Sequence, residues 1–161
     1  MRWIRLAPLA FVALLGACMV SVGPDAVRQP GAPPPAPAAE VDAFAELAAE
    51  ARRDAGCSTP LAWHADVAAA AQGHSEDMRQ RDYFDHVGPD GRTPMQRVQS
   101  AGVEVSAVAE NIAHGQPTAV AVLESWLGSP GHRRNLLNCE YTHHGVGLSG
   151  TYWTHVLVRL R

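Results

Sequence analysis

The feature that most constrains the fold is a Pro- and Ala-rich stretch, Val20 to Ala39, which contains the run Gly31-Ala-Pro-Pro-Pro-Ala-Pro. Proline removes backbone donors and fixes φ near −65°, so a stretch of this composition stays extended and builds no core. We therefore expect a semi-rigid tether, followed by a folded unit that begins near Glu40 and continues to Arg161. A unit of this length forms one domain.

The residues ahead of the tether have the order of an export signal. Two basic residues, Arg2 and Arg5, precede an apolar run from Leu6 to Leu15. This run is shorter than the roughly 20 residues that cross a bilayer. Small residues follow it, which completes the pattern of a secretory signal peptide. A short membrane helix or a buried strand is the alternative interpretation.

The fragment Leu15-Gly16-Ala17-Cys18 resembles the bacterial lipobox, in which the cysteine becomes the lipidated first residue of the mature protein. The resemblance implies a signal peptide over residues 1–17 and a lipidated Cys18 at the start of a tether over 18–39. Lipoproteins of this type carry several acyl chains, and two or more chains anchor stably where one does not. We expect an exported protein of the cell envelope, attached to a membrane through this lipid.

The charge balance argues against a nucleic-acid partner. The whole chain has a formal net charge of −3. Removal of Arg2 and Arg5 with the signal peptide leaves 11 basic against 16 acidic residues, a net charge of −5. Nucleic-acid binding needs a positive surface that neutralises phosphates.

Helical patterns come first in the folded unit and strand patterns come last. Apolar residues recur at helical spacing in the first half, and alternate on both sides of Gly150 near the end. This order favours an α+β fold, with helices packed on a mostly antiparallel sheet. We predict helices over 41–55, 65–81, 94–101 and 118–127, a turn at 88–91, and strands over 145–149 and 152–159.

Cys57 and Cys139 remain once Cys18 carries lipid, and they are the only possible pair. Disulfides persist outside the cytoplasm, so we predict that these two are joined. Because 82 positions separate them, the bond could contribute ~4–5 kcal/mol in the chain-entropy model. A reactive or metal-binding thiol is the alternative.

Four fragments of the domain, taken in order, resemble the bacterial branch of the CAP superfamily. They are Tyr83-Phe84-Asp85-His86, Glu110-Asn111-Ile112-Ala113-His114-Gly115, Trp126-Leu-Gly-Ser-Pro-Gly-His132-Arg-Arg-Asn135-Leu-Leu, and Gly145-Val-Gly147 followed by Tyr152-Trp153-Thr154. The superfamily is named for cysteine-rich secretory proteins, antigen 5 and pathogenesis-related proteins. The resemblance covers residues 41–161 and implies a three-layer α-β-α sandwich with a cleft on one face.

In the eukaryotic branch of this superfamily the cleft holds two histidines and two glutamates, and the histidine pair can bind a divalent metal. His86 matches the first histidine and Glu110 the first glutamate. Ser129 stands where the second glutamate is expected, and Tyr152 where the second histidine is expected. Two of the four cleft residues that form this tetrad, the first histidine and the first glutamate, are therefore present at the matching positions.

His132 is the natural substitute, because the bacterial branch has Gly-His after the helix that carries the tryptophan. We expect His86 to end a turn after the second helix, Glu110 to end or open a strand, and His132 to begin the segment after the tryptophan helix. These three residues should then converge on one concave surface, with the hydroxyl of Tyr152 beside them. His86 and His132 could bind Zn²⁺ and leave a position open for water. The alternative is that these histidines fix loops by hydrogen bonds, with Glu110 accepting from backbone amides.

The other histidines and the tryptophans have simpler expected roles. His74 falls on the buried face of its helix, and we expect a satisfied core residue. His155 alternates with Trp153 and could face the cleft or solvent. We expect Trp126 and Trp153 to be core aromatics, although either could line a lipid-binding cleft. No partner is evident for the remaining ones, His64, His114, His143 and His144.

Three functions are compatible with these features. The first is a non-enzymatic module, displayed from a membrane, that binds lipid, envelope polymer or another protein. The second is a hydrolase that acts on peptide or envelope polymer through a metal-activated water. The third is a structural envelope protein without a ligand. The incomplete tetrad favours the first.

Overall fold

The computed structural model describes residues 37–161, so the predicted signal peptide and the lipidated Cys18 lie outside the described residues. No helix in this range is both long and apolar enough to cross a membrane. The elements follow one another in the order α1 (Pro37–Asp54), β1 (Ala62–Trp63), α2 (Ala65–Arg81), α3 (Pro94–Ser100), β2 (Val105–His114), α4 (Ala119–Gly128), α5 (Pro130–Leu136), β3 (His143–Ser149) and β4 (Tyr152–Leu160).

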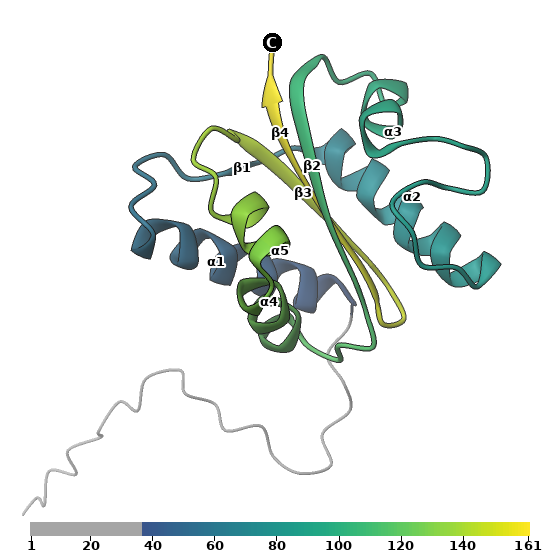
Figure 1. Cartoon of the computed structure of the whole chain (residues 1–161), viewed down its shortest axis with the longest axis horizontal. Coiled ribbons are helices and arrows are strands. Elements are labelled where there is room, and N and C mark those ends of the chain that lie inside the picture. The colour runs from purple at the N-terminus through teal and green to yellow at the C-terminus, as the bar shows by residue number, and fades with distance from the viewer. Residues whose placement is uncertain (1–36) are drawn as a thin grey trace, which may run out of the picture. The chain divides into compact units, whose positions relative to one another are not determined.

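The strands form one sheet in the order β1-β3-β4-β2. In the described part of the chain, only the short β1–β3 pairing is parallel, and the two long pairings are antiparallel. Helices α1, α4 and α5 pack on one face of the sheet, and α2 and α3 on the other (Figure 1). The predicted α+β class and the α-β-α layering are confirmed.

Three local expectations were wrong. The first helix begins at Pro37, where the sequence had suggested the last residues of the tether. Glu40 explains the difference, because its buried carboxylate accepts a 2.6 Å hydrogen bond from the amide of Ala119 at the start of α4. No helix was predicted directly after α4, but a further helix, α5, begins there, with Ser129 as N-cap and Pro130 in its first turn.

The third correction concerns Glu110, which we had placed at one end of a strand. It lies inside the ten-residue strand β2, opposite Val156 of β4. The pairing of β2 with β4 continues from Val105 to His114. Such cross-strand pairing overrides the weak strand propensity of the Ala, Glu and Asn residues in this segment.

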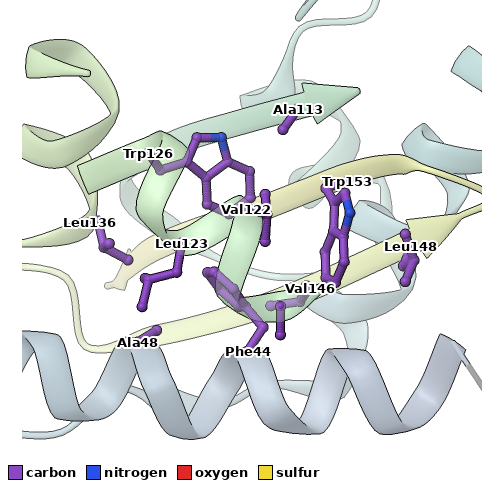
Figure 2. Close-up of a cluster of buried hydrophobic side chains, with 11 residues drawn as sticks. Phe44, Ala48, Ala113, Val122, Leu123, Trp126, Leu136, Val146, Leu148 and Trp153 are labelled. Atoms are coloured by element: carbon purple, nitrogen blue, oxygen red, sulfur yellow. The ribbon is translucent and has the colours of Figure 1, made fainter. Parts of the chain in front are cut away.

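The core between the sheet and α1, α4 and α5 is centred on three aromatic rings, Phe44, Trp126 and Trp153 (Figure 2). All three are fully buried, and Phe44 meets Trp126 edge-to-face with ring centroids 5.2 Å apart. The indole N–H groups donate to the carbonyls of Ile112 and Gln116. These bonds satisfy the polar atoms of the two tryptophans and confirm them as core residues.

Helix α2 lies directly on β3 because two glycines of that strand leave room for it. A Cβ added to Gly145 would collide with the backbone of Ala68, and one added to Gly147 with the backbone of Gln72. The close approach lets Ser75 of α2 donate to Thr154 of β4 at 2.8 Å. The position of α2 relative to the sheet is therefore set by backbone contact.

The predicted disulfide between Cys57 and Cys139 is present, and it joins the loop after α1 to the loop after α5. Buried Arg52 supports the same connection, because it donates to the carbonyls of Leu136, Asn138 and Tyr141. The covalent bond and the arginine together hold the end of α1 against the segment that leads into β3.

Candidate functional site

The candidate site is built around the carboxylate of Glu110 on the edge strand β2. Its side chain is almost completely buried, and its Oε2 accepts a 2.7 Å hydrogen bond from Arg97 of α3. Arg97 also donates to the carbonyls of His86 and Arg92, so one guanidinium connects α3, the preceding loop and the strand. A buried carboxylate needs such a partner, because an unpaired buried charge is costly.

His86 occupies the other oxygen of the same carboxylate. Its Nδ1 lies 2.9 Å from Glu110 Oε1, and 48% of its side chain is exposed. The hydrogen bond to Glu110 raises the pKa of His86, although partial burial opposes the effect. Since a carboxylate only accepts, Nδ1 carries the proton, and Nε2 makes no hydrogen bond to any of the described residues.

His74 lies behind this pair on α2 and is buried, in line with the expectation from its helix face. Its Nε2 is 3.0 Å from the carbonyl of Asp85 and 3.8 Å from Glu110 Oε1. Burial lowers the pKa of His74. The hydroxyl of Tyr83, which donates to Asp77, lies 3.5 Å from the Nδ1 of His74. His74 therefore holds the loop that carries His86 against α2.

His132 approaches the site from the opposite side, on α5. Burial lowers its pKa, and the positive charge of His86 lowers it further. Its carbonyl accepts from Asn111 of β2, and its ring lies 6.4 Å from that of Trp126. In the described part of the chain, no hydrogen bond links the ring of His132 to His86 or Glu110.

Tyr152 lies apart from these groups. It pairs with His114 at the far end of the β2–β4 ladder, and the two rings stack at 3.9 Å. Four residues along a strand separate His114 from Glu110, roughly 13 Å at the usual rise. Among residues 37–161, no hydrogen bond joins Tyr152 to His86 or Glu110.

The described side chains do not fit a zinc centre. They include no group of three or more His, Cys, Asp or Glu residues arranged to hold a metal ion. Both oxygens of Glu110 are engaged, one by Arg97 and one by His86. Catalytic zinc sites have three protein ligands and an open position.

Two further features were not found from the sequence. Arg97 had no assigned role, although a basic residue one turn into a helix capped by Thr93 could have been flagged. His144 and His155 form a buried pair with Nδ1 and Nε2 3.1 Å apart. Their contact depends on the register of β3 against β4, and no local pattern signals it.

The arrangement presents a fixed imidazole at the edge of the sheet. Glu110 sets its proton on Nδ1, Arg97 sets the position of Glu110, and Nε2 of the half-exposed ring makes no hydrogen bond within residues 37–161. Such a group can donate to or accept from a bound molecule. No Ser, Thr or Cys side chain within residues 37–161 makes a hydrogen bond to His86, so a nucleophile–base pair is not formed there.

These features define a class, an α+β sandwich with a His–Glu pair at the edge strand of its sheet. Residues 46–157 match the family model described as the CAP, cysteine-rich secretory protein family. The chain belongs to this family.

Two Bacillus subtilis proteins are similar in sequence. YkwD is 39% identical over 101 residues, 62% of this chain and 39% of YkwD. The membrane protein YlbC is 39% identical over 99 residues, 62% of this chain and 29% of YlbC. The match therefore spans well under half the length of either relative.

Two solved structures share the fold. The first is an extracellular Bacillus anthracis protein that contains an SCP domain, with a TM-score of 0.74 and 33% identity. The alignment covers 80% of this chain and 45% of that one. The second is an outer surface protein of Borrelia burgdorferi, with a TM-score of 0.71 and 20% identity over 76% of this chain and 94% of that one.

Proposed function

We propose that this chain is a lipid-anchored CAP domain outside the cytoplasm that binds a component of the cell envelope at His86, without catalysing a reaction. The lipobox-like fragment that ends at Cys18 supports the anchor and export. The similar structures described as extracellular and as an outer surface protein agree with this location.

The observation that supports the binding role is that both carboxylate oxygens of Glu110 already have hydrogen-bond partners. Arg97 and His86 take up both of its oxygens, so the carboxylate positions His86 and is not itself free to ligate or attack. Nε2 of the half-exposed ring, which bonds to none of the described residues, is then a preset hydrogen-bonding group for a ligand. The raised pKa of His86 favours the imidazolium form and therefore an acidic group, such as a carboxylate or phosphate.

The metal-assisted hydrolase is the less favoured alternative. It requires His86 and His132 to share a metal, and the described residues offer no third ligand beside them. Zinc analysis of full-length protein, purified without chelators or a His tag, separates the two functions. One zinc per chain that is lost in His86→Ala would support the hydrolase.

Binding can be tested with full-length protein in detergent and two probes. Co-sedimentation with isolated peptidoglycan sacculi tests envelope polymer, and native mass spectrometry with phosphatidylglycerol tests lipid. We expect one probe to bind and His86→Ala to weaken that binding at least tenfold. His143→Ala, on a different strand, is the matched control and should bind normally. Equal binding by wild type and His86→Ala, or binding of neither probe, would contradict the proposal.

A further inference from the structure

A concave surface lies at the opposite edge of the sheet from β2, apart from the His86 site. It is a groove of about 490 Å³ between α1 and α2, along the free edge of β3. Most of its lining is apolar, including Val41, Ala69 and Leu148, and the half-exposed ring of Trp63 stands at its margin. None of these side chains takes part in the His86 site.

Beyond His144, β3 has no neighbouring strand along this groove because β1 ends early, and Val146, which lines the groove, is itself buried with 3% exposed. Strand β1 pairs only with His143 and His144, and the amide of His64 then donates to the carbonyl of His144. The next partner for β3 would be the carbonyl of His64. That carbonyl instead accepts from Ala68 and starts α2.

The unpaired stretch of β3 ends at Leu148, two residues after Val146. The side-chain amide of Gln72 accepts from the N–H of Leu148 at 2.9 Å and donates to its carbonyl at 3.2 Å, as a neighbouring strand would. Since outward-facing peptide groups alternate along a strand, Val146 points the same way as His144 and Leu148. Within residues 37–161, nothing bonds to the outward N–H and C=O of Val146.

Val146 therefore has an outward backbone N–H and C=O without partners among the described residues, whereas the outward peptide groups of His144 and Leu148 are already bonded. One residue of an extended peptide could pair with this donor and acceptor. Strand addition at a sheet edge works in this way, with backbone bonds giving affinity and adjoining pockets giving selectivity. The apolar walls suit an aliphatic side chain. Among residues 37–161, Asp42 is the only charged residue that lines the groove, so a basic neighbour in the peptide complements it.

We propose that this groove binds an extended peptide of another protein, which pairs with Val146 and places an aliphatic residue in the groove and a basic residue beside Asp42. This interaction does not depend on the His86 site. The peptide occupies the position that a longer β1 would have filled.

The probe is a capped heptapeptide of alternating valine and arginine, added to ¹⁵N-labelled full-length protein in detergent. We expect the amide signals of Val146 and Leu148 and the indole signal of Trp63 to shift on binding. Ala69→Phe fills the wall of the groove and should weaken binding at least tenfold. Ala65→Phe, an exposed change on the same helix but outside the groove, should bind like wild type.

Two changes test the strand and the charge separately. An N-methylated peptide cannot pair with Val146 and should lose binding at least tenfold. A second capped heptapeptide, of alternating valine and glutamate, tests the charge. The Asp42→Arg variant should bind this peptide in preference to the valine–arginine peptide. Equal binding of the N-methylated peptide would indicate a lipid-like apolar site and overturn the proposal. Concentration-dependent dimers that mask Val146 without peptide would also overturn it, by assigning the edge to a second copy.

Discussion

Acidification is expected to destabilise the folded domain strongly, because His144 and His155 face each other inside it. Their rings lie 3.1 Å apart between Nδ1 and Nε2, and both side chains are buried. No carboxylate bonds to either ring in the described part of the chain, and the Nδ1 of His155 has no partner. Protonation would place positive charge beside Arg52, which is itself buried.

The size of the effect follows from the change in pKa. Burial, reinforced by Arg52 and His143, lowers the pKa of His144 from 6.5 to about 4. Burial also lowers the pKa of His155 well below its ordinary value. Because the folded state binds these protons less well than the unfolded state, the contribution of these two histidines to stability is constant well above pH 6.5 and is lost as the pH falls below it. Between pH 6.5 and pH 4, His144 alone accounts for a loss of about 3 kcal/mol.

Urea unfolding of the Cys18→Ser chain at several pH values measures this loss. Val122→Ala, a buried change that does not titrate, should lower the free energy of unfolding by the same amount at every pH. The double variant His144→Phe/His155→Phe should lose most of the decline below pH 6.5. The reasoning would be refuted if the wild type kept its full stability at pH 4.5, or if the double variant declined as steeply as the wild type.

Three further outcomes are expected. Cys18→Ser should leave the domain folded but move it from the membrane fraction to the soluble fraction, and retention after a high-salt wash would contradict the anchor. Glu110→Gln should cost about 3 kcal/mol in urea unfolding, because it leaves the guanidinium of Arg97 without its charge partner; a loss below 1 kcal/mol would show that the pair is dispensable. Gly147→Ala should cost about 1–3 kcal/mol, because a methyl group cannot fit against α2, and unchanged stability would contradict that packing.

The elements with strong local signals were predictable from the sequence. The second helix was expected over 65–81 and α2 has those bounds, because apolar residues recur at helical spacing along it. The disulfide followed from having one possible pair, and the two tryptophans followed from their aromatic bulk. These features depend on composition or on short-range spacing.

Features that depend on long-range register were not predictable. Arg97 reaches Glu110 only after α3 has docked beside β2, and His144 meets His155 only after β3 and β4 have paired. Glu110 and His86 could be nominated through the family resemblance, and they lie within hydrogen-bonding distance. Tyr152 was nominated in the same way, but the strand register places it beside His114.

The most direct test of the binding role is to observe the imidazole of His86 while the ligand is added. In ¹⁵N NMR spectra of the full-length protein, soluble glycan–peptide fragments released from sacculi should shift the Nε2 resonance of His86. The Nδ1 resonance, which the bond to Glu110 fixes, should change little. A saturable shift at Nε2 is the expected result. Fragments that bind while both His86 resonances stay unchanged would contradict the account.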